Sequence, residues 1–148
     1  MKVIKGDCRL QTAVDYLTDY TGVIGAVIAD HEGLVVVCSP PSLMHGEKFA
    51  ALGPEMFDIA DRIIGKIITP GCRHISLRTG DRWLTVAATL NFRLVVLADE
   101  KADDLLNVRI QRALEMIANH IKEKYPAEVY SARPEAIKKE EAMEASHV

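Results

Sequence analysis

The order of apolar and polar positions divides most of the chain into helices and strands. Apolar residues that recur at helical spacing predict helices over 8–20, 47–68 and 104–124. Runs rich in valine and isoleucine, bounded by polar turns, predict strands over 23–29, 34–38, 73–78, 82–90 and 93–98. The connections within each group of strands are too short for crossovers, so we expect antiparallel pairing. The predicted fold class is an α/β (α+β) sandwich: one five-stranded antiparallel sheet with helices on both faces, in the order α-β-β-α-β-β-β-α.

The first two strands form the clearest local signal. Two apolar runs, 23–29 and 34–38, flank a polar turn at 30–33. Gly33 can adopt the positive φ that a tight connection between strands often needs. Neither run alternates between apolar and polar residues, so we expect a hairpin that is covered on both faces.

The apolar face of the second predicted helix is wider than one sheet requires. Three further residues, Phe57, Ile64 and Ile68, widen a continuous stripe to about half of the circumference. The excess could face a second helix, for example one from another subunit. Gly53-Pro54 leaves a second boundary open, because proline is favoured at the first position of a helix. The stripe itself consists of Phe49, Leu52, Met56, Ile59, Ala60, Ile63 and Ile67.

Composition and charge exclude several classes of function. The 148 residues are 49% hydrophobic and 26% charged, which is ordinary for a globular domain. The net charge of −3 gives no electrostatic attraction to nucleic acid or to an anionic membrane. No apolar run is long enough to span a bilayer, and the first residues do not form a signal segment. We therefore expect a protein without nucleic-acid or membrane partners.

The cysteines and the C-terminal composition refine this picture. An odd number of scattered cysteines, at 8, 38 and 72, favours reduced thiols and a cytoplasmic location. We expect one domain over 1–126. Residues 127–148 form a charged C-terminal tail that is either inert or a helical segment that docks on a partner.

The chain lacks the motifs of common catalytic and cofactor sites. Cys72 and His74 form the only short metal-ligand pair, whereas a structural zinc site needs four ligands. Neither a phosphate-binding loop nor a nucleophile elbow is present. The sequence therefore predicts no enzyme, no bound metal and no cofactor.

Four arginines lie at the predicted ends or starts of strands, at 73, 78, 82 and 93. They could contact an acidic partner. For any one of them, charge that keeps a strand end soluble is the favoured interpretation. Trp83, the only tryptophan, is expected in the core or in a dimer interface.

Several local sequences, in this order, resemble the Roadblock family, which includes dynein light chains and the bacterial partners of gliding-motility GTPases. The resemblance covers most of the chain, from about residue 10 to 124. Its segments are GVIGAVIAD at 22–30, EGLVV at 32–36, the Ala/Ile-rich helix at 50–68, LVVLAD at 94–99 and LLNVR at 105–109. It implies a profilin-like or longin-like fold and a non-catalytic homodimer that binds small Ras-like GTPases as a scaffold or activator. The Gly53-Pro54 break departs from the smooth second helix that family members often carry.

The resemblance also implies where partners bind. Family dimers join through their second helices and third strands, so the candidate interface here comprises Met56, Ile59, Ile63, His74, Ser76 and Arg78. A GTPase surface near its switches is polar, and the candidate contacts are therefore Arg62, Arg78 and Arg82. The sequence thus predicts a cytoplasmic dimeric regulator or scaffold of a small GTPase in a prokaryote.

The alternative is a small-ligand-sensing domain, or another protein-interaction domain, of the same fold. Small residues around a cavity between sheet and helix would favour ligand sensing. Dense packing of Val27, Val36, Val86 and Val96 would disfavour it.

Overall fold

A computed structural model describes residues 8–43, 45–69 and 71–124. The predicted domain boundary at 126 and the predicted tail at 127–148 lie outside these residues.

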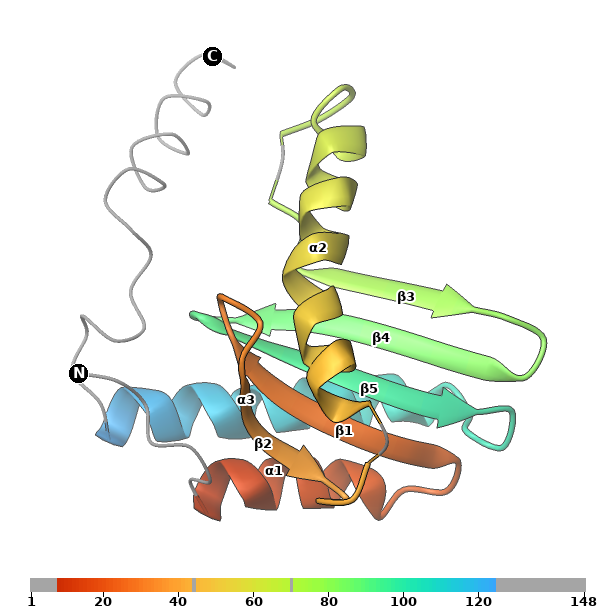
Figure 1. Ribbon diagram of the computed structural model, residues 1–148, viewed down its shortest axis with the longest axis vertical. Helices are drawn as coiled ribbons and strands as arrows, with labels where there is room; N and C mark the ends of the chain where they lie inside the picture. The colour runs from red at the N-terminus through yellow and green to blue at the C-terminus, as the bar shows by residue number, and fades with distance from the viewer. Residues whose placement is uncertain (1–7, 44, 70, 125–148) are drawn as a thin grey trace.

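The predicted fold class is confirmed. The elements along the chain are α1 (Cys8–Thr18), β1 (Val23–Asp30), β2 (Val35–Ser39), α2 (Gly46–Ile64), β3 (His74–Arg78), β4 (Arg82–Thr89), β5 (Phe92–Asp99) and α3 (Leu105–Lys124). The strands form one antiparallel sheet in the order β2-β1-β5-β4-β3 (Figure 1).

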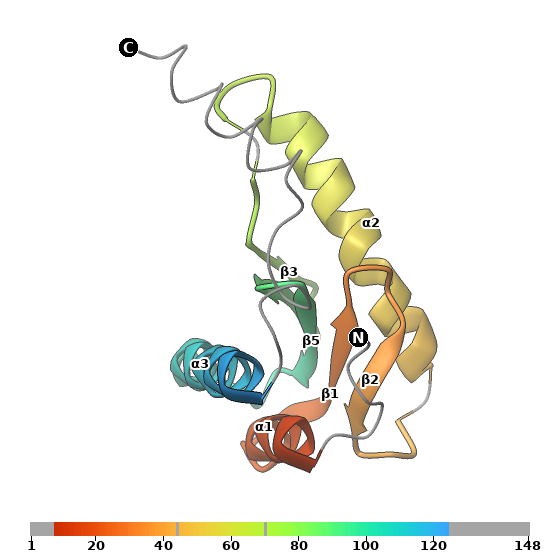
Figure 2. The ribbon, with the colours of Figure 1, turned by 90° about the vertical axis from the view of Figure 1, so that its left-hand side faces the viewer.

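The sheet separates two apolar clusters. Helices α1 and α3 cover one face and α2 covers the other (Figure 2). Alternate residues of β1 serve the two sides: Ala26 and Ile28 belong to the larger cluster under α1 and α3, whereas Val27 and Ala29 belong to the smaller one under α2. The prediction that the hairpin is covered on both faces is therefore confirmed.

Helix α2 is continuous, and the alternative start at Pro54 is wrong. It begins at Gly46 and contains the proline. Ala50 and Phe57, on either side of this position, are both buried against the sheet, so tertiary packing holds the two halves in line. A Cβ atom placed on Gly33 would lie 3.5 Å from Cγ of Pro54, which puts the proline ring close to the hairpin turn. The helix ends at Ile64, four residues before the predicted end.

The second half of α2 continues beyond the β3 edge of the sheet (Figure 1). The loop that follows returns to the sheet and is tied to the helix by Asp61. One carboxylate oxygen of Asp61 accepts hydrogen bonds from the backbone N–H groups of Gly71, at 2.9 Å, and Cys72, at 2.7 Å. This attachment fixes the start of β3 beside the projecting half of the helix.

Candidate interaction surface

The projecting half of α2 and the turn that follows it carry an exposed row of isoleucines. We call Ile59, Ile63, Ile67 and Ile68, which are 44%, 59%, 83% and 64% exposed, the isoleucine ridge. The sheet instead meets Ala50, Gly53 and Phe57, and Met56 is partly buried beside them. The predicted stripe is therefore split: its first part packs on the sheet and its last part faces solvent.

Strand β3 forms an edge of the sheet next to this ridge. It pairs with β4, and within the described residues no strand lies on its other side. Ile75 packs in the cluster under α2, so Leu77, two residues on, points to the same face and is 52% exposed. The ridge and the α2 side of β3 together present an apolar surface at one end of the molecule.

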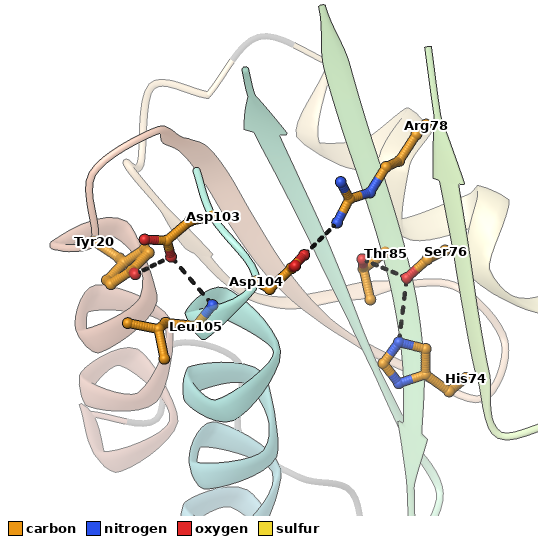
Figure 3. A network of polar contacts seen from close by, with 8 residues as sticks. All are labelled: Tyr20, His74, Ser76, Arg78, Thr85, Asp103, Asp104 and Leu105. Carbon is orange, nitrogen blue, oxygen red and sulfur yellow. Dashed lines mark hydrogen bonds and ion pairs between the residues drawn. The ribbon is translucent and has the colours of Figure 1, made fainter. Parts of the chain in front are cut away.

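The opposite side of β3 is polar (Figure 3). Nε2 of His74 lies 3.3 Å from Oγ of Ser76, which in turn lies 3.0 Å from Oγ1 of Thr85 on β4. Nucleophilic catalysis by a serine needs a base and a group that orients the base. Within the described residues no carboxylate contacts His74 in this chain of hydrogen bonds, so the group that would orient the base is missing from it.

Arg78 joins this side of β3 to the start of α3. Its guanidinium lies 4.0 Å from the ring centroid of Trp83. It also donates a hydrogen bond of 3.0 Å to Asp104, which Figure 3 shows. Trp83 is buried in the larger cluster, which confirms the expectation of a core position. Beside this pair, Asp103 accepts hydrogen bonds from the Tyr20 hydroxyl and from the backbone N–H of Leu105. The bond to Asp103 is the main cause that raises the pKa of Tyr20.

The three candidate GTPase contacts do not form one cluster. Arg78 and Arg82 flank the turn between β3 and β4, where Arg82 lies 3.6 Å from the carboxylate of Asp81. Arg62 is exposed on α2, near the other end of β3, since its neighbour Asp61 holds the loop that leads into this strand. A single partner that contacts all three must span β3, a distance of about 13 Å.

Two of the thiols, those of Cys38 and Cys72, pack beside the cluster under α2 and donate hydrogen bonds to nearby carbonyl oxygens. Cys72 Sγ donates to the carbonyl oxygen of His74 at 3.5 Å, and Cys38 Sγ donates to that of Pro40 at 3.3 Å. Burial raises the pKa of the Cys38 thiol, which makes it a weak nucleophile. In the described ranges no three His, Cys, Asp or Glu side chains are grouped so that they could hold a metal ion.

A groove along the β2 edge was not predicted from the sequence. This cavity of about 590 Å³ lies between β2, the loop after it and the first turn of α2. The Gln11 side chain of α1 donates a hydrogen bond of 3.1 Å to the carbonyl oxygen of Cys38, and both residues line it. The two prolines after β2 indicated only a break in the pattern, because the course of such a loop depends on contacts with distant elements.

Among the helices of the described residues, none combines the length and the apolar character needed to cross a bilayer.

Known protein families and solved structures share this fold. The family model for the Roadblock/LC7 domain matches residues 9–98. MglB of Myxococcus xanthus superposes with a TM-score of 0.73 at 13% identity, over 84% of this chain and 96% of that one. A gliding protein MglB from Thermus thermophilus gives 0.72 at 19%, over 82% and 96%. Profilin IA of Acanthamoeba castellanii gives 0.54 at 19%, over 74% and 97%, which confirms the profilin-like fold. No curated protein sequence gave a significant match.

Proposed function

This chain belongs to the Roadblock/LC7 domain family, and on that premise we propose that it is a non-catalytic homodimer that regulates or scaffolds a small Ras-like GTPase in the cytoplasm. The observation that carries the proposal is the isoleucine ridge. Four exposed isoleucines, two in the last part of α2 and two in the turn after it, are an aggregation hazard unless another surface covers them.

A second copy of the chain suits this surface. The ridge lies next to the open edge of β3, whose backbone can pair with another strand. In a two-fold dimer the same patch from both subunits meets, so a ridge would cover a ridge while one β3 pairs with the other. His74, Ser76 and Arg78, which are exposed on the polar side of β3, would lie at this interface together with Ile59 and Ile63.

The GTPase is the partner expected for the polar residues around the dimer. A regulator shifts the switch loops of a GTPase only if it binds the two nucleotide states with different affinity. Arg62, Arg78 and Arg82 are exposed and positively charged, which suits contact with an acidic, polar surface.

Binding of purified small GTPases of the source organism, loaded with GDP or with a non-hydrolysable GTP analogue, tests this proposal. We expect the affinities for the two states to differ at least about tenfold. Charge reversal at Arg62 or Arg82, one at a time, should weaken binding about tenfold without changing the dimer. Arg78 also lies at the proposed dimer interface, so its charge reversal tests GTPase binding only once light scattering has shown that the variant is still a dimer. Arg112→Glu on α3 is the matched control, since Arg112 is also exposed but lies on the other face. No binding in either state by any of these GTPases contradicts the proposal.

A small ligand in the β2 groove is the second candidate function. The groove is large enough for a small organic molecule and mixes apolar walls with Gln11, His45 and Lys48. Val27, Val86 and Val96 are fully buried, so the space between sheet and helices is filled. Within the described residues we therefore assign ligand sensing to this groove. A metabolite library screened by thermal shift, with Gln11→Ala as the control, separates this function from GTPase binding.

A further inference from the structure

Arg93 does not behave as a surface charge that keeps a strand end soluble. It lies on β5 beneath α2 and is partly buried. A Cβ atom placed on Gly53 would lie 3.5 Å from Cβ of Arg93, so the arginine stem packs against the helix. Its guanidinium carbon lies 5.4 Å from the ring centroid of Phe57, a buried side chain that gives the group a fixed position.

The charge of Arg93 is not neutralised within the described residues. Its Nη1 donates to the carbonyl oxygen of Phe92 at 3.1 Å, and its Nε is buried without a hydrogen-bond partner. None of the ion pairs among the described residues involves Arg93. A buried charge without a partner costs free energy, and a buried donor without an acceptor is rare in native proteins.

Arg73 adds a second positive charge that acts on Arg93. Burial, with a smaller contribution from the positive charge of Arg73, lowers the pKa of Arg93. Arg73 also forms no ion pair in the part of the chain that the structure describes. Its carbonyl oxygen accepts a hydrogen bond from the backbone N–H of Ala88, which faces Arg93 in the β4–β5 register. Asp61, which accepts hydrogen bonds from the backbone of Gly71 and Cys72, forms no ion pair with either arginine among the described residues.

We propose that Arg93 and Arg73 form a binding site for an oxyanion, either a carboxylate or a phosphate, where α2 crosses β5. Two guanidinium groups offer planar sets of N–H donors that match the oxygens of both anions. The platform of Phe57 and the packing against Gly53 hold Arg93 in place before the anion arrives, which reduces the entropy lost on binding. The site is independent of the proposed GTPase partner.

Inorganic phosphate and a short glutamate-rich peptide, each at constant ionic strength, are the probes. The Nε–Hε signal of Arg93 is followed by NMR in the full chain. We expect a saturable shift of this signal with at least one probe. In Arg93→Met, where this signal is lost, calorimetric titration with that probe should show affinity at least about tenfold lower than in the native chain. Arg73→Met should weaken binding less, and Arg112→Met on α3 should leave it unchanged. The probe that saturates at the lower concentration identifies the source, a free phosphate or a protein carboxylate.

The stability of Arg93→Met separates an anion site from a purely structural arginine. Methionine keeps much of the stem that packs on the helix but removes the uncompensated charge. Without an added anion, its melting temperature should stay the same or rise by up to about 3 °C. A clear fall in melting temperature together with unchanged anion affinity overturns the proposal, as does the absence of saturable binding by both probes.

Discussion

In α3, Ile110, Ile117 and Ile121 are completely buried, whereas in α2 Ile59 and Ile63 are about half exposed. The two helices have 20 and 19 residues and lie on opposite faces of one sheet. Helix α3 has α1 beside it and the sheet beneath it, so its apolar side meets two surfaces. Helix α2 has no neighbouring helix within the described residues, and its second half passes the last strand (Figure 1). Two helices with similar apolar periodicity therefore form a fully packed core on the α3 face and leave an exposed apolar surface on the α2 face.

The stability of the protein should be more sensitive to loss of apolar atoms on the α3 face than on the α2 face. Ile110→Ala should lower the free energy of unfolding by about 2–5 kcal/mol, because the surrounding core closes a cavity only partly. Urea unfolding followed by circular dichroism, at one fixed chain concentration, measures this. Val108→Ala, on the same helix but half exposed, should change it by about 0.5 kcal/mol or less. Equal losses for both variants would show that α3 is not packed as described.

On the α2 face, a substitution in the isoleucine ridge should change the oligomeric state of the chain. Ile63→Asp puts a charge into the isoleucine ridge, where the expected dimer cannot bury it without a large cost. Dissociation should become at least about 100-fold easier, and light scattering should report half the native mass while circular dichroism stays unchanged. Val108→Asp is matched in exposure, at 50% against 59% for Ile63, and should keep the native mass. A native chain that is monomeric at high concentration rules out the dimer.

The sequence predicted the strands, their antiparallel pairing and the burial of both hairpin faces, because these features depend on short turns and on local composition. It did not predict which side of α2 faces the sheet. The width of an apolar stripe measures how much surface is available for burial and does not identify what covers each part. At the crossing, small residues such as Ala50 and Gly53 let the helix approach the strands, and Ile59 and Ile63 remain outside.

The positions of Pro54 and Arg93 depend on contacts that are distant in sequence. Local propensity favours a helix start at Pro54, but the ring lies beside Gly33 of the hairpin turn and the helix continues through it. Arg93 follows a polar turn and looks exposed in the sequence, yet α2 crosses above it. The ridge residues Ile59 and Ile63 were among the predicted interface residues, and their role in a dimer remains a prediction.

Arg78 connects the edge strand β3 to Trp83 and to the start of α3, and its removal should have a modest effect on stability. Arg78→Ala loses the contact with Trp83 and the ion pair with Asp104, both of which are partly open to solvent. We expect a loss of about 0.5–1.5 kcal/mol in the free energy of unfolding. Only the ion-pair part should shrink between about 0.1 M and about 1 M salt. Arg78→Lys keeps the charge without the planar stacking, so its free energy of unfolding should lie between those of the native chain and Arg78→Ala. A loss that salt removes completely would leave no role for the ring contact.

The smallest expected effect is a gain of stability on the α2 face. Gly53 is a buried helical residue, and a Cβ atom there would lie 3.5 Å from Cβ of Arg93 and 3.6 Å from Cγ1 of Val86, which are ordinary contacts. Gly53→Ala should therefore raise stability by about 0.5–1 kcal/mol, because alanine loses less backbone entropy than glycine in a helix. Gly22→Ala is the opposite case: φ is +90° and the added atom would lie 2.3 Å from the backbone nitrogen of Ala102. That variant should lose more than about 1 kcal/mol. Thermal unfolding of both variants measures the contrast, and a loss at Gly53 would mean that α2 lies closer to the sheet than described.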